Sequence, residues 1–67
     1  MSTLAEELPR QQARCRELLE QALSIGPAGA VLVAFLRHDL AEAERAAAAG
    51  DVVAMLASCQ KLRDYKS

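Results

Sequence analysis

The sequence predicts an all-α protein, a chain of three antiparallel helices with a long central helix that associates as a homodimeric helical bundle. Apolar residues recur three and four positions apart, which is the spacing of one face of an α-helix. Glycine interrupts this pattern at Gly26-Pro27 and Gly50-Asp51, so three helices are expected. Residues 28 to 36 are apolar on every side of their helix, and a second copy of the chain is the simplest cover for the side that two short neighbouring helices leave open.

Size and charge limit the class of protein. Sixty-seven residues form a single domain, 1 to 67, which is marginally stable unless a disulfide, a metal or a partner assists it. Eight Lys and Arg residues against nine Asp and Glu residues give a formal net charge of -1. Because this leaves no excess positive charge for phosphates or anionic lipids, we expect neither nucleic acid nor a membrane as a partner.

The first helix is expected over residues 9 to 23. Ser2 or Thr3 can cap a helical turn, and Thr3 with Glu6 fits the capping-box pattern. Pro9 either kinks a helix that begins at this lead-in or occupies the first turn of a helix that begins near Leu8. We favour the second, because proline is tolerated in a first turn. The apolar positions at helical spacing are Leu8, Cys15, Leu18, Leu19, Ala22 and Leu23.

The second helix is expected over residues 27 to 49. Gly26 suits the left-handed conformation that ends a helix, and Pro27 suits the first position of the next one. Gly29 marks either a close approach of another backbone or an incidental glycine in a frayed turn. We expect the dimer interface on the apolar first half of this helix, at Val31, Leu32, Phe35 and Leu36.

The third helix is expected over residues 51 to 65, with Gly50 ending the second helix and Asp51 capping the third. The turn is so tight that these two helices should be antiparallel neighbours. Tyr65 has two interpretations, a cover over the core or an exposed contact. The core face of the third helix is expected to hold Val52, Met55, Leu56, Cys59 and Leu62, against a stripe on the second helix at Leu40, Ala43, Ala46 and Ala47.

Polar side chains follow the apolar half of the second helix. We expect Arg37, His38 and Glu42 to contact a protein partner, since burial should end there. His38 and Glu42 are four residues apart, a spacing that also suits a surface salt bridge. Asp39 shares the side of the helix that carries Leu32, so its carboxylate needs a partner. An arginine from the first helix or from another subunit would serve.

No residue pattern indicates chemistry. The adjacent side chains of His38 and Asp39 project in different directions and cannot form a catalytic dyad. Cys15 and Cys59 lie far apart without a CxxC motif, and one histidine cannot complete a zinc site with them. Reduced thiols filling the core are favoured over a disulfide. We therefore predict no catalytic, cofactor-binding or metal-binding residue, and a protein that is not an enzyme.

The sequence pattern predicts neither a signal peptide nor a membrane-spanning segment. The amino-terminal residues MSTLAEELPR carry acids where a signal peptide carries bases. The longest apolar run, residues 28 to 36, is much shorter than the roughly 20 residues that a bilayer requires. We expect a cytoplasmic location.

Two parts of the chain resemble known kinds of protein. The segment AEAERAAAAGDVVAMLASCQKL resembles one tetratricopeptide unit, but no second copy is present, so it indicates only a helical hairpin. The blocks LPRQQARCRELLEQ, SIGPAGA and AGDVVAML, in this order, resemble those of small accessory proteins carried by phages and prophages of proteobacteria. This second resemblance covers most of the chain and implies a location in the bacterial host cell. It carries over no functional residue.

The predicted function is therefore non-enzymatic binding to proteins, first to a second copy and then to a host protein. Some small dimeric helical phage proteins bind components of type IV pilus assembly or quorum-sensing activators, and this chain is similar to them in size and helical style. The alternative is a small DNA-associated regulator or a structural subunit of the phage particle. A helix-turn-helix is disfavoured because Val, Ala, Met and Leu stand where a recognition helix presents Arg, Asn and Gln.

Overall fold

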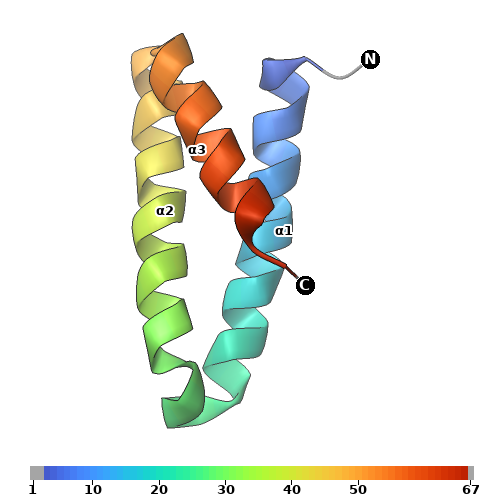
Figure 1. The fold of residues 1–67 in the computed structure, drawn as a ribbon, viewed down its shortest axis with the longest axis vertical. Coiled ribbons are helices and arrows are strands. Elements are labelled where there is room, and N and C mark those ends of the chain that lie inside the picture. Colours follow the sequence, from blue (N-terminus) through green and yellow to red (C-terminus); the bar gives the residue numbers. More distant parts are fainter. Residues whose placement is uncertain (1–2, 67) are drawn as a thin grey trace.

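The computed structural model describes residues 3–66, in which three α-helices are joined by one short 3-10 turn and one tight turn. The elements are α1 (Leu4–Ser24), η1 (Gly26–Gly29), α2 (Ala30–Ala49) and α3 (Val52–Asp64). Helix α2 runs back alongside α1, and α3 turns again and lies against both (Figure 1). The predicted all-α class, the three helices and their antiparallel order are thereby confirmed.

Helix α1 begins at Leu4, earlier than the predicted residue 9, and Pro9 lies inside it. The Thr3 hydroxyl accepts a hydrogen bond from the Glu6 backbone N–H at 3.3 Å, so Thr3 is the cap. The alternative Ser2 lies outside the described residues. The Thr3 cap and the burial of Leu8 in the core stabilise the additional turn. Pro9 has no backbone N–H to donate to the carbonyl four residues earlier, but that carbonyl lies in the exposed first turn.

The turns follow their glycines. Gly26 has a φ of 69° and Gly50 a φ of 66°, the left-handed conformation predicted for both. Asp51 caps α3, because its carboxylate accepts a hydrogen bond from the Ala54 N–H at 3.2 Å. Pro27 does not begin α2 as predicted; it lies in the tighter η1 turn, and α2 begins at Ala30.

The η1 turn passes very close to α1 at Gly29. A Cβ atom added there would lie 2.1 Å from the carbonyl oxygen of Ala22, far inside van der Waals contact. Of the two interpretations of Gly29, close approach of another backbone is therefore the one confirmed. The hairpin of α1 and α2 can close this tightly only because the residue has no side chain.

The core is a narrow cluster where the three helices meet. Leu8, Leu36, Leu62 and Cys15 are its largest fully buried side chains. Three positions predicted to face the core are exposed, namely Leu23, Val52 and Leu56, and so is Ala47 of the predicted stripe. Leu56 and Leu62 are six residues apart and point about 120° from each other on a helix. When α3 packs with Leu62 buried against α1 and α2, the side chain of Leu56 therefore faces solvent.

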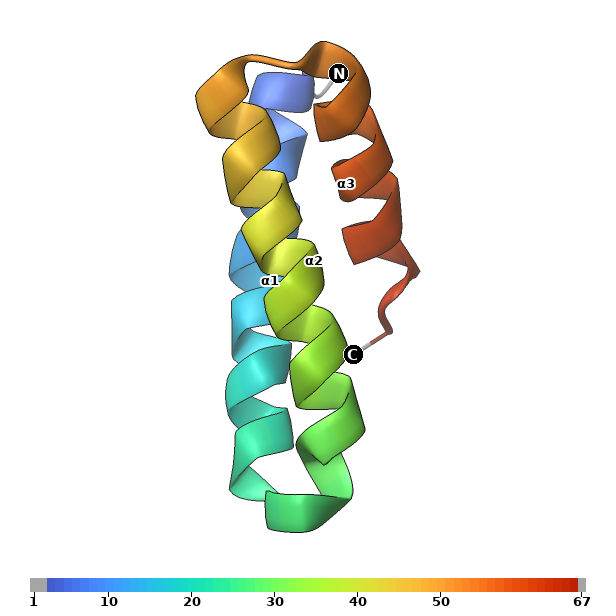
Figure 2. The same cartoon turned by 90° about the vertical axis from the view of Figure 1, so that its left-hand side faces the viewer.

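Helix α3 covers only part of the α1–α2 hairpin. It has 13 residues against 20 in α2. Figures 1 and 2 show α3 beside the end of the hairpin that holds the start of α1 and the end of α2, while the end at η1 continues without a third helix. The part of α2 nearest η1 thus has α1 as a neighbour on one side and no helix on the other.

We predict that Gly29→Ala destabilises the protein by about 2 kcal/mol, the cost typical of forcing additional atoms into a packed site. The new methyl group would collide with the Ala22 carbonyl. Urea unfolding followed by circular dichroism at one fixed protein concentration measures this change.

Ala28→Gly, at an exposed neighbouring position, is the control and should cost at most about 1 kcal/mol. An alanine at residue 29 that left the stability unchanged or raised it would contradict the close approach of the two backbones.

Candidate protein interface

Large apolar side chains are exposed where α3 is absent. On the η1-proximal part of α2, Val31 is 69% exposed, Phe35 60% and Leu32 38%. We call these three residues the open half of α2. Ile25, which precedes η1, is exposed beside the same end of the hairpin. Of the apolar run that was predicted to need a cover on all sides, these exposed residues are not covered within one chain, whereas Val33 and Leu36 are buried.

One residue of the predicted dimer interface lies elsewhere. Leu36 is fully buried, with 0% exposure, and belongs to the intramolecular core together with Leu18 and Leu40. It lies one residue after Phe35, so its side chain is turned by about 100° toward α1 and α3. The predicted interface is corrected accordingly to the remaining three residues, Val31, Leu32 and Phe35.

The predicted partner-contact residues are divided between two sides of α2. Arg37 and His38 are exposed and Glu42 is half-buried. His38 and Glu42 are four residues apart and share a side, whereas Arg37 and Glu42 lie about 140° apart around the helix. The three do not form one compact cluster, and a partner that contacts all of them has to curve around α2.

Glu42 forms an ion pair with Arg45, three residues further along, although the spacing of His38 and Glu42 also suits a salt bridge. The hydrogen bond from Arg45 lowers the pKa of the Glu42 carboxyl below its usual value, and the nearby His38 adds a smaller effect in the same direction. Both side chains of the pair are largely solvated, so it contributes little to folding stability.

Asp39 has a partner that the sequence did not predict. The Tyr65 hydroxyl donates a hydrogen bond to the Asp39 carboxylate at 2.6 Å, and both residues are half-buried. This replaces the arginine expected from the first helix or from another subunit. Burial of the phenol, reinforced by the adjacent carboxylate, raises the pKa of Tyr65 well above its usual value of 10.0. Of the two interpretations of Tyr65, the cover over the core is confirmed.

Two further contacts hold the end of α3 against α1. The backbone carbonyl oxygen of Leu62 accepts hydrogen bonds from Arg14 Nη2 at 2.6 Å and from Cys15 Sγ at 3.4 Å. The Tyr65 backbone N–H also donates to this carbonyl, at 3.3 Å, so α1 supplies two of its three donors at the helix end, where the regular helical hydrogen bonds stop. The sequence does not predict this role of Arg14, because a bond to a distant backbone atom leaves no periodic signal.

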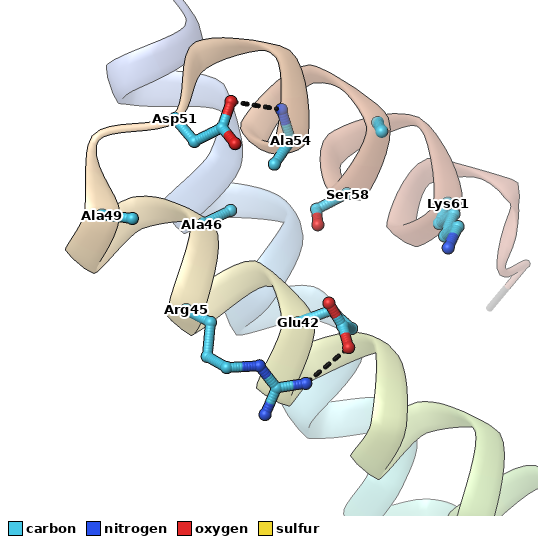
Figure 3. Close-up of a pocket in the computed structure, with 9 residues that line it drawn as sticks. Glu42, Arg45, Ala46, Ala49, Asp51, Ala54, Ser58 and Lys61 are labelled. Carbon is cyan, nitrogen blue, oxygen red and sulfur yellow. Dashed lines mark hydrogen bonds and ion pairs between the residues drawn. The ribbon is translucent and has the colours of Figure 1, made fainter.

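A shallow hollow lies between α2 and α3 near their connecting turn (Figure 3). Its volume is about 300 Å³. Alanines supply much of its wall, Ala46 and Ala49 from α2 and Ala54 and Ala57 from α3. Charged side chains stand at its edge, including Glu42, Arg45, Asp51 and Lys61. Because alanine side chains are short, the two helices leave space between them that neither fills.

The described residues contain no cluster that indicates chemistry. Among residues 3–66, no group of His, Cys, Asp and Glu side chains is arranged to hold a metal ion. Cys15 and Cys59 are both buried and free, and burial raises the pKa of the Cys15 thiol, which disfavours the reactive thiolate. In the same part of the chain, no helix is long and apolar enough to cross a membrane.

Comparison of the chain with known protein families, with curated proteins and with solved structures finds no match.

We predict that Tyr65→Phe lowers the free energy of unfolding by about 1 to 2 kcal/mol, toward the lower end of the values for a hydrogen bond to a charged group because both residues are only half-buried. The folded state holds the Tyr65 pKa above its unfolded value. This contribution is therefore complete below pH 10 and is lost as pH rises through the unfolded and then the folded pKa.

A double-mutant cycle with Asp39→Ala, measured by urea unfolding at pH 7, isolates the pair. Additive effects of the two substitutions would contradict a direct bond between Tyr65 and Asp39.

Proposed function

We propose that this chain is a non-enzymatic protein–protein interaction module that associates with a second copy through the open half of α2. The observation that carries the proposal is the exposure of Val31, Leu32 and Phe35 on the part of α2 that α3 does not reach. Single exposed apolar residues are ordinary, but neighbouring ones on one half of a helix form a patch typical of protein contacts. A small chain with a narrow core also gains stability when such a patch is covered.

We further propose that the dimer binds a host protein through the surface that includes Arg37, whose side chain points about 160° away from Phe35. His38 and Glu42 share the side of Phe35 and contribute to the dimer contact itself. The support is the similarity of three sequence blocks to small accessory proteins of phages and prophages. A bacterial protein is then the expected partner, for example a component of type IV pilus assembly or of quorum sensing. Charged residues around an apolar centre suit this role, because they set orientation and specificity.

A DNA-associated regulator is the alternative, and it has less support. The outward side of α3 carries Val52, Val53 and Leu56, which offer no hydrogen-bond donors to base edges. The net charge of -1 also provides no general attraction to phosphates. An interaction module for proteins accounts for the same exposed apolar residues without these difficulties.

We predict that Phe35→Asp weakens the homodimer at least about 30-fold, as expected when a charge replaces a central aromatic contact worth about 2 kcal/mol. Sedimentation equilibrium at micromolar concentration measures the dissociation constant. Leu56→Asp is the matched control, because Leu56 is exposed to a similar degree on α3 and lies outside the open half of α2. Loss of the dimer in the control alone, or a monomeric parent chain, would contradict this interface.

We also predict that the chain captures a specific protein from a proteobacterial lysate and that Arg37→Glu reduces this capture several-fold. Affinity capture with quantitative mass spectrometry is the measurement. Arg63→Glu, the same change at an exposed site on α3, should leave the capture unchanged. If no protein is enriched over a bait-free column, binding to a host protein is excluded for that host.

A further inference from the structure

The open half of α2 and the alanine-walled hollow lie on the same side of α2. Val31 and Ala49 are 18 residues apart, which is five complete helical turns, so their side chains point in the same direction. Phe35 and Ala46 are 11 residues apart and point within about 20° of each other. One face of α2 therefore carries exposed large side chains near η1 and a hollow lined by short side chains at the other end.

We propose that the homodimer is antiparallel and two-fold symmetric, with Phe35 of each copy seated in the alanine-walled hollow of the other. The inference rests on the proposed self-association and specifies its geometry. A two-fold axis near residue 40 places residue 35 of one α2 opposite residue 46 of the other, and residue 31 opposite residue 49. In a two-fold symmetric contact, both copies use the same surface patch. The patch must therefore contain both the protruding Phe35 side chain and the hollow that receives it.

The size of the hollow fits this occupant. Its volume of about 300 Å³ corresponds to roughly ten molecules of liquid water. A phenyl ring fits within it, whereas a second complete helix does not. The wall formed by Ala46 and Ala54 is apolar (Figure 3). The phenyl ring would therefore move from water onto another apolar surface, which is favourable.

The charges around the hollow allow this patch on one copy to contact the same patch on a second copy. Glu42 and Asp51 are acidic and Arg45 and Lys61 are basic, so these four carry no net charge. An axis near residue 40 also brings His38 of one copy opposite Glu42 of the other. The His38 imidazole and the Glu42 carboxylate can then form a hydrogen bond across the axis, where a one-signed patch would repel its copy.

The area of contact favours this arrangement over a local one. A stable interface buries about 800 Å² on each partner. A contact along the whole of α2 and the helix beside it, about 30 Å long and about two helix widths across, covers roughly 600 Å² on each copy. A contact between the two η1-proximal halves alone covers about half of that. In the antiparallel arrangement, each copy's α3 also lies beside the part of the other copy that has no third helix.

The test fills the hollow without touching the open half of α2. Ala49→Phe places a ring in the hollow, and we expect the dimer dissociation constant to rise at least tenfold in sedimentation equilibrium. Ala48→Phe is the matched control, since Ala48 is also exposed but points about 100° away, and it should leave the constant within twofold.

A disulfide tests the register. Val31→Cys combined with Ala49→Cys should give a covalent dimer on mild oxidation, because the two sites lie about 27 Å apart within one α2 and can bridge only between copies. The parent chain, whose thiols are buried, and the combination of Val31→Cys with Ala48→Cys should remain non-covalent.

The outcomes separate the two proposals. A parent chain that is monomeric up to about 100 µM, where a dimer of micromolar affinity would be populated, overturns both the self-association and its geometry. A parent dimer that Ala49→Phe leaves intact, with no bridge between residues 31 and 49, overturns the antiparallel seating alone. A weakened Ala49→Phe dimer together with the bridge supports the seating of Phe35 in the hollow.

Discussion

The anchoring of the end of α3 determines which surfaces the molecule leaves open. The Leu62 carbonyl oxygen accepts bonds from Arg14 and Cys15 of α1, and Tyr65 reaches across to Asp39 of α2. These bonds tie the end of α3 to both other helices beside the middle of α2. Beyond that point, within residues 3–66, no third helix covers the hairpin. The exposure of Phe35 and the burial of Leu36, one residue away, both follow from where α3 ends.

Local signals explain the part of the fold that the sequence predicted. The left-handed conformations at Gly26 and Gly50 and the cap at Asp51 depend on a few adjacent residues, so their residue types predict them. The predicted start of the first helix at residue 9 was wrong. It relied on the preference of proline for a first turn, whereas the Thr3 cap and the burial of Leu8 are the stronger effects and start the helix at Leu4.

The rest of the candidate site depends on long-range geometry. The apolar run of residues 28 to 36 has no polar side, so its periodicity could not distinguish Phe35 at the surface from Leu36 in the core. The bond between Tyr65 and Asp39 joins residues 26 positions apart, and the bond from Arg14 ends on a backbone atom. No spacing rule for side chains along one helix reveals contacts of either kind.

The alanine run explains both the stability of α2 and the weakness of the core. Alanine has the highest helix propensity, so residues 46 to 49 hold their helix without help from packing. The same short side chains contribute little buried apolar area, and they leave the hollow beside α3 unfilled. A fully buried phenylalanine contributes roughly 1.5 to 3 kcal/mol, a large share of the stability of a domain this small. The sequence places its single phenylalanine outside the core, at the surface, while the hollow stays lined with alanine. Within one chain, the Phe35 ring stays exposed and the hollow stays unfilled. Between two copies, the ring of one and the hollow of the other are complementary.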